Sequence, residues 1–261
     1  MTINVLMVGD VVGNPGRQLL SNCLPDLVRD HAIDMVVVNV ENAAGGFGVT
    51  TAIYRQFKDM GVAVMTSGNH IYDKRELMQQ MGDTPHLLRP LNFPGNHPGR
   101  GYLTSVIKGV KVAVVNLIGR VFMGLSDCPF QVIQSHLGKI REETPVILVD
   151  FHGEATSEKQ AMGYFLAGKV SAVVGTHTHV MTADETILAG HTAYITDLGM
   201  TGPKDGILGM EKGPIIQRFL DQRPTLFTPA KSLETMLNAV VIQIEPESGK
   251  AVSIHRIVHV I

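Results

Sequence analysis

Cysteine is scarce in this sequence, which has only Cys23 and Cys128 among its 261 residues. So few thiols exclude a fold held together by disulfides, and neither cysteine has a partner at zinc-finger spacing. The net charge is only −2, so an excess of basic residues is lacking as well. We therefore expect no duplex nucleic acid as a partner, whereas a small nucleotide remains compatible with this charge.

Long apolar runs are also missing, and none reaches the length that crosses a membrane. The apolar segment at residues 3–8 has no basic segment before it and is followed at once by Asp10, unlike a signal peptide. We expect a cytoplasmic protein with no membrane partner. The sequence also lacks a P-loop, a G-x-S-x-G turn and the G-x-G-x-x-G spacing of dinucleotide-binding proteins.

Short apolar, β-branched runs alternate with helical patterns, which predicts parallel strands joined by helical crossovers. Helices are predicted from Pro15 to Val28, over 52–60 and over 154–167. Strands are predicted at residues 3–8, 35–40, 62–65, 102–107, 111–117, 145–149, 172–174, 187–188, 193–195, 239–245 and 251–260. The pairs at 102–117 and 239–260 resemble antiparallel hairpins. Without repeats or linkers, the chain is predicted to form one domain over residues 1–261, with two layers of β-sheet flanked by helices.

Polar side chains of a few types follow five of these apolar runs. They are Asp10, Glu41-Asn42, Asn69-His70, His152 and His177-Thr178-His179. Ligands collect beyond the carboxyl ends of strands in open α/β sheets, so we expect these residues to converge. Oxygen and nitrogen ligands suit hard or borderline divalent ions, and two such ions can clamp a phosphate and activate a water. Taken singly, each block also fits a turn or a cap, but five in order favour a two-metal site.

The blocks resemble, in the same order, those of the calcineurin-like metallophosphoesterases, which are D-x-H, G-D, G-N-H, H and G-H-x-H. The residues of these blocks are most similar to those of the YmdB-like branch, which includes a cyclic-nucleotide phosphodiesterase. This likeness covers nearly the whole chain and includes residues 7–13, 41–46 and 197–203. Two positions depart from the wider superfamily: Val12 stands where D-x-H has its histidine, and Glu41 replaces the bridging aspartate. Both departures resemble the branch, and the first leaves one metal site short of an imidazole.

The resemblance implies a four-layer α/β/β/α sandwich with two mixed sheets, and a pair of divalent metal ions. Glu41 would bridge the two ions. Asp10 and His179 would complete the first site, and Asn69, His152 and His177 the second. No thiolate is offered, and the family resembles iron and manganese enzymes, so iron or manganese is expected ahead of magnesium or zinc.

The expected reaction is hydrolysis of a small phosphoester by a hydroxide that bridges the metals. The resemblance implies 2′,3′- or 3′,5′-cyclic nucleotides as substrates. His70 is assigned as the general acid to the leaving oxygen. Asn42 is expected to donate its amide NH₂ to a phosphate oxygen, and the backbone of Gly45 and Gly46 is expected to line the same pocket.

Two other functions stay open on the sequence alone. A phosphomonoesterase would use the same metals, and a non-catalytic regulator would use the pocket to sense a nucleotide. The segment 197–203 fits either a substrate loop or a turn at the edge of the site. Homo-oligomerisation is compatible with the sequence, but no residue pattern indicates it.

Overall fold

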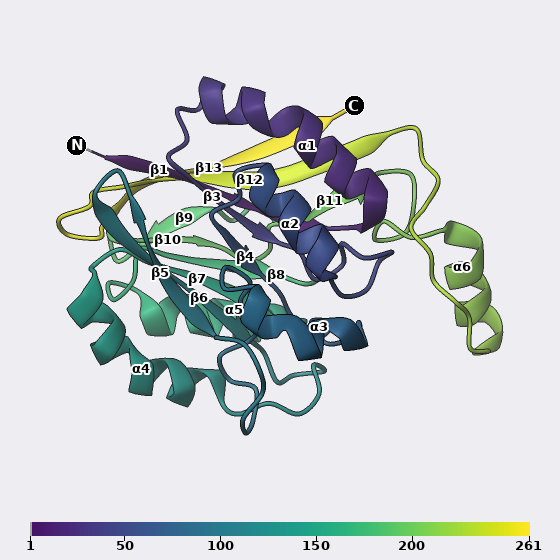
Figure 1. The fold of residues 1–261 in the computed structure, drawn as a ribbon, viewed down its shortest axis with the longest axis horizontal. Helices are drawn as coiled ribbons and strands as arrows, with labels where there is room; N and C mark the ends of the chain where they lie inside the picture. Colours follow the sequence, from purple (N-terminus) through teal and green to yellow (C-terminus); the bar gives the residue numbers. More distant parts are fainter. Residues whose placement is uncertain (1) are drawn as a thin grey trace.

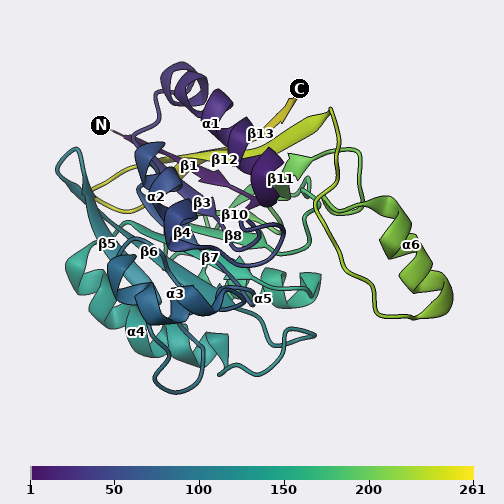
Figure 2. The same cartoon turned by 45° about the vertical axis from the view of Figure 1, so that its right-hand side comes forward.

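Thirteen strands form two β-sheets that pack face to face (Figures 1 and 2). The structure is a computed structural model that describes residues 2–261. The first sheet contains β1 (Ile3–Val8), β2 (Asp10–Val11), β3 (Met35–Asn39), β4 (Val64–Thr66), β11 (Met200–Pro203), β12 (Thr235–Ile244) and β13 (Ala251–Val260). The second contains β5 (Tyr102–Ile107), β6 (Val110–Ile118), β7 (Ile147–His152), β8 (Ala172–Thr176), β9 (Thr186–Leu188) and β10 (Thr192–Ile195).

Helices cover the outer faces of both sheets, as Figures 1 and 2 show. The helices are α1 (Gly13–Asp30), α2 (Thr51–Asp59), α3 (Arg75–Gln80), α4 (Pro129–Glu143), α5 (Thr156–Leu166) and α6 (Lys212–Asp221), with a short 3₁₀ turn at Met81–Asp83. α1 and α2 pack on the first sheet, and α4 and α5 on the second. Thr50 caps α2, because its hydroxyl accepts from the backbone N–H of Ile53 at 3.2 Å. α6 stands away from both sheets at the side of the molecule.

Alternation along the central strands explains the layers, because successive side chains point to opposite faces of a sheet. On β3, Val36 and Val38 pack under α1 and α2, whereas Met35 and Val37 pack between the two sheets. A third core lies between the second sheet and α4 and α5, and Phe151 belongs to it. Three apolar cores separate four layers, so the predicted α/β/β/α sandwich with two mixed sheets is confirmed.

Parallel pairing brings the ends of several strands to one rim. β1, β3 and β4 run parallel in the first sheet, and β6, β7, β8 and β10 do so in the second. β12 inserts antiparallel between β1 and β11, and β13 pairs with it as the predicted C-terminal hairpin. The carboxyl ends of β3, β4, β7 and β8 therefore deliver the polar blocks to a shared edge.

Three helices and two strands were not predicted: α3, α4, α6, β2 and β11. The segment 197–203 differs from both of its sequence-based interpretations, because residues 200–203 form β11 rather than a loop or turn. β11 pairs parallel with β2, with Met200 opposite Asp10. Its physical role is to extend the first sheet past the end of β1 and so fix the backbone that carries Asp10.

Candidate metal centre

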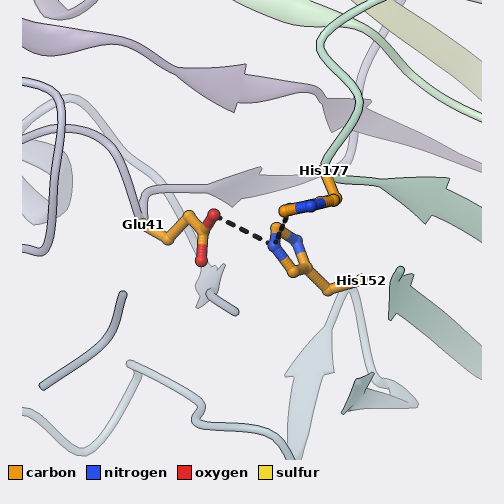
Figure 3. Close-up of side chains that lie close together, drawn as sticks. All are labelled: Glu41, His152 and His177. Carbon is orange, nitrogen blue, oxygen red and sulfur yellow. Dashed lines mark hydrogen bonds and ion pairs between the residues drawn. The ribbon is translucent and has the colours of Figure 1, made fainter. Parts of the chain in front are cut away.

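Three of the predicted ligands meet at the rim between the two sheets. Glu41 follows β3, His152 ends β7 and His177 follows β8, and one ligand atom from each lies within 4.8 Å of the others. Nε2 of His152 is 2.9 Å from Oε1 of Glu41 and 3.0 Å from Nδ1 of His177 (Figure 3). Side chains that are far apart in sequence thus turn toward one point.

Asp10 adds a buried oxygen beside this group, and Asn69, between Gly68 and His70, carries a second buried oxygen. Oδ2 of Asp10 accepts from the backbone N–H of His177 at 3.1 Å. Its other oxygen, Oδ1, and Oδ1 of Asn69 find no hydrogen-bond partner anywhere in residues 2–261. An unpaired buried polar atom is costly and rare in native proteins. Carboxylate, amide and imidazole donors with two unsatisfied oxygens fit a divalent cation.

Gly68 shows how closely these groups approach one another. A Cβ atom at this position would lie 2.2 Å from Nε2 of His152 and 2.3 Å from Oε2 of Glu41. Any side chain there would occupy the space between two ligands. The backbone N–H of His70 also points at Glu41, donating to Oε2 at 3.3 Å. The turn after β4 is therefore shaped around the Glu41 carboxylate.

His179 does not join the group of three. Its Nδ1 is 3.0 Å from the carbonyl oxygen of Leu208, and its Nε2 is 3.2 Å from Oδ1 of Asn42. A backbone carbonyl and an amide oxygen both only accept, so each ring nitrogen of His179 faces an acceptor and would donate to it. Nε2 can bind a cation only after it gives up its proton and its contact with Asn42.

The turn that carries both histidines has an unusual backbone. His177 has φ of 103° and His179 has φ of 63°, the left-handed region that side-chain-bearing residues rarely adopt. Such conformations persist where the surroundings enforce them, and they cluster at functional sites.

Asp197 is the residue that enforces this turn. Its Oδ2 accepts from the backbone N–H of Thr178 at 3.1 Å and from Nζ of Lys159 at 2.6 Å. Its Oδ1 accepts from the N–H of Gly199 at 2.8 Å, and the carbonyl of Gly199 accepts from the N–H of Asp10 at 3.1 Å. Lys159 and Asp197 are both fully buried. One buried ion pair thus holds the histidine turn and the backbone of Asp10 together.

A second buried network orients the His152 ring. Nδ1 of His152 is 2.9 Å from Oγ1 of Thr176, and that hydroxyl donates to Oδ1 of Asp150 at 2.7 Å. Nδ2 of Asn39 donates to the other Asp150 oxygen at 3.1 Å, and the Thr66 hydroxyl donates to it as well. With Nδ1 held in this way, Nε2 points into the site. No sequence pattern marked these residues, although Asp150 stands two positions before His152, a predicted ligand.

Burial and mutual attraction set the charges at the centre. For Glu41, burial opposes ionisation, but the His152 charge outweighs it and holds the pKa of the carboxyl below its ordinary value. Burial also opposes charge on His152, yet Glu41 raises the pKa of that imidazole to about 9. Burial, with the neighbouring His152 charge, lowers the pKa of His177 to about 3, whereas burial raises the pKa of Asp10 to about 6. His177 is therefore neutral and has a lone pair to offer.

A cavity of about 1060 Å³ opens onto these groups. Asn42 and His70, the predicted catalytic residues, both line it. Nδ1 of His70 is 2.8 Å from Oδ2 of Asp73, which orients the ring. Nδ2 of Asn42 donates to the carbonyl of Gly46 at 2.9 Å, leaving its second N–H for another acceptor. Gly45 and Gly46, both with positive φ, form the turn behind Asn42 and are not among the cavity-lining residues.

No helix within residues 2–261 is both long enough and apolar enough to pass through a lipid bilayer.

Comparison with known proteins gives consistent matches over the whole length. Residues 6–257 match the model of a family described as YmdB-like protein. A 2′,3′-cyclic-nucleotide 2′-phosphodiesterase from Bacillus subtilis is 46% identical, over 98% of this chain and 96% of the relative. The crystal structure of a novel phosphatase from Mycoplasma pneumoniae superposes with a TM-score of 0.94 at 31% identity, covering 100% of this chain and 94% of that one. A 5′-nucleotidase precursor from Thermus thermophilus, 13% identical, shares the fold alone, with a TM-score of 0.59 over 99% of this chain and 54% of its own.

Proposed function

Because the chain belongs to the YmdB-like family, we propose that it is a metal-dependent phosphodiesterase that hydrolyses 2′,3′- or 3′,5′-cyclic nucleotides. One observation supports this most directly. The Glu41, His152 and His177 group lies beside a buried oxygen of Asp10 that no residue in the described range 2–261 satisfies, and Asn69, in the turn next to Glu41, carries another such oxygen. A bound cation would give these oxygens the partner that they lack.

We assign the ligands by their place around Glu41. Asp10 and His179 would share one divalent cation with Glu41, and Asn69, His152 and His177 the other. We propose iron or manganese, because the donors are oxygen and nitrogen without a thiolate. When bound, such cations neutralise phosphate charge and generate a nucleophile from water at neutral pH. Asp10 and Glu41 are the only carboxylates among the six ligands, so the loaded site would keep surplus positive charge and attract an anionic phosphoester.

His70 lines the same cavity as the ligand turn and would protonate the leaving oxygen. Its Nδ1 faces the Asp73 carboxylate, so Nε2 is the nitrogen that is free to hold and give a proton. Asn42 would orient the phosphate with its remaining N–H. Positioned donors of this kind act by holding the substrate in line for attack.

The test is elemental analysis of the purified protein together with a cyclic-nucleotide panel. We expect divalent metal in the wild type, and turnover of adenosine 2′,3′- or 3′,5′-cyclic phosphate. Glu41→Gln removes the bridging carboxylate and should lose both metal and turnover. Glu142→Gln, on the exposed side of α4, is the matched control and should keep both. Glu41→Gln protein that retains full metal content and rate would contradict the proposal.

Phosphomonoesterase activity is a second candidate, favoured by the likeness to the Mycoplasma pneumoniae phosphatase. Comparing p-nitrophenyl phosphate with bis(p-nitrophenyl) phosphate separates the two. Faster hydrolysis of the diester supports the proposal, and dominant hydrolysis of the monoester favours the alternative. The cytoplasmic location and homo-oligomerisation stay predictions.

A further inference from the structure

The cavity at the metal centre has two unlike sides. One side carries the ligands and the polar residues around them. The other is apolar and carries three aromatic rings, Phe47, Phe219 and Phe227, together with aliphatic residues such as Met210 and Ile215. Metal binding explains the residues of the polar side of the cavity but not those of the apolar side. An apolar wall inside the same cavity indicates that the substrate has an apolar part next to its phosphate.

Phe227 is held in place by packing and by a charged neighbour. It packs against an apolar cluster that includes Met210 and Ile215, so the ring is backed on one side. The guanidinium of Arg218, from α6, lies 5.2 Å from its centroid. Arginine and a phenylalanine ring attract one another in this geometry, and the guanidinium that covers the ring itself accepts a flat ring stacked on it.

The aromatic side begins directly beside the proposed proton donor. The ring of Phe47 meets the ring of His70 edge-on, with centroids 4.9 Å apart and planes at 69°. A substrate with its phosphate against the ligand turn would therefore carry its remaining part straight onto the apolar wall. One cavity can therefore hold both the phosphate and the rest of the same substrate molecule.

Phe219 and Gln222 complete the wall from α6 and its end. Phe219 is 84% exposed, an unusual state for a phenylalanine at a cavity rim and one that a bound apolar ring would relieve. The Gln222 amide also lines the cavity and offers both a donor and an acceptor. A ligand with a flat face and a polar edge fits both groups.

We propose that this wall, centred on Phe227 and Phe219, binds the nucleobase of the substrate and makes the site select nucleotides over phosphodiesters without a base. The inference rests on the proposed phosphodiesterase function. Every base has a flat π-face, so stacking here accepts all four bases with modest differences between them.

The experiment compares two substrates that share the cyclic phosphate. One is adenosine 2′,3′-cyclic phosphate, and the other is 1-O-methylribose 2,3-cyclic phosphate, which has no base. In Phe227→Ala and Phe219→Ala we expect the kcat/KM advantage of the nucleotide to fall about tenfold, with the baseless substrate unchanged. Leu226→Ala, an exposed neighbour that does not line the cavity, is the control and should leave both values unchanged. Phe219 is mostly exposed, so its variant keeps the test valid if Phe227→Ala fails to fold.

Binding of adenosine alone, measured by NMR titration, gives a readout independent of catalysis. We expect the wild type to bind adenosine but not ribose, and both phenylalanine variants to bind adenosine about tenfold more weakly. If neither cyclic phosphate is hydrolysed while these binding effects appear, the phosphodiesterase function is wrong and the base site stands. If both are hydrolysed and the variants slow them equally or not at all, the base site is overturned and the function stands.

Discussion

Protons and cations compete for the same atoms of the ligand residues. The pKa of His152 is raised to about 9 by its buried pairing with Glu41, so without metal the imidazole holds its proton near neutral pH. A cation binds only the neutral ring, so loading must expel that proton. Metal affinity should therefore rise with pH and level off once the His152 pKa is passed.

This predicts that Mn²⁺ affinity increases between about pH 7 and about pH 9, by up to tenfold per pH unit. Calorimetry in two buffers of different ionisation enthalpy would count the protons released. We expect about one proton per protein from His152 near pH 7. Affinity that is flat over this range, with no proton release, would show that the imidazole is already neutral.

His70 gives a prediction of the opposite kind, because it touches the substrate side and is not a proposed ligand. His70→Ala should keep its metal and lose roughly 10²–10⁴-fold in kcat, the usual contribution of a general acid. The measurement is steady-state kinetics with elemental analysis of the same sample. Glu76→Gln, exposed on the following helix, is the control. A His70→Ala enzyme at full rate would remove the general-acid role.

At the residue scale, the positions of the proposed ligands at strand ends were predictable, and the residues that support them were not. Asp10, Glu41, Asn69, His152 and His177 each follow an apolar run, so their place at strand ends was readable. Asp197 and Lys159 carry no such mark, because their role comes from a contact between residues 38 positions apart inside the fold. The set of ligands and roles remains a prediction for experiment.

At the element scale, the Lys159–Asp197 pair joins α5 to the segment between β10 and β11. Lys159→Met leaves the Asp197 charge buried without its partner and should loosen the turn that carries His177 and His179. We expect Mn²⁺ affinity to fall about 10- to 100-fold, as for other groups that orient metal ligands. Calorimetry on refolded, monodisperse protein would measure it.

Two further variants separate positioning from a general loss of stability. Lys159→Met combined with Asp197→Asn removes both charges, so it should be more stable than Lys159→Met alone while Mn²⁺ affinity stays weak. Lys139→Met, exposed on α4, should change neither quantity. If Lys159→Met binds Mn²⁺ as tightly as the wild type, the pair has no positioning role.

The elements that were predicted share a strong apolar pattern, and α3 and α6, which were missed, do not. β1, β3 and β7 are fully or almost fully buried, so they read as continuous apolar runs. α3 has six residues, too few for a helical period to emerge. Within α6 only Ile215 is buried, so its apolar residues do not face a core. α4 was readable in principle, from Pro129 at its first turn and apolar residues at 130, 133, 137 and 140.

At the scale of the whole molecule, α6 is the part least tied to the rest. Phe219 and Leu220 are 84% and 75% exposed, and the helix projects beyond both sheets (Figure 2). Regions with few buried contacts open locally at low free energy. We expect the amide hydrogens of α6 to exchange much faster than those of α1, whose apolar face lies in a core.

Mass spectrometry of hydrogen exchange would test this, with and without an adenosine nucleotide. Exchange in α6 should slow on nucleotide binding, because Arg218 and Phe219 line the cavity. α1 is the internal reference and should not respond. Protection of α6 equal to that of α1 in the free protein would contradict this assignment.

The organisation of residues 1–261 as one domain stays a prediction.

The position of β12 in the first sheet has a consequence for the order of events during synthesis. β1 pairs with β12 along its whole length, with Ile3 opposite Ile244. The first strand to be synthesised therefore has no partner on this side until β12 has been synthesised. Until that partner leaves the ribosome, β1 has an open edge and β11 lacks the antiparallel neighbour that seats it beside Asp10. The nascent chain therefore cannot close the proposed ion-binding rim before β12 has left the ribosome, and any capture of a cation would follow that step.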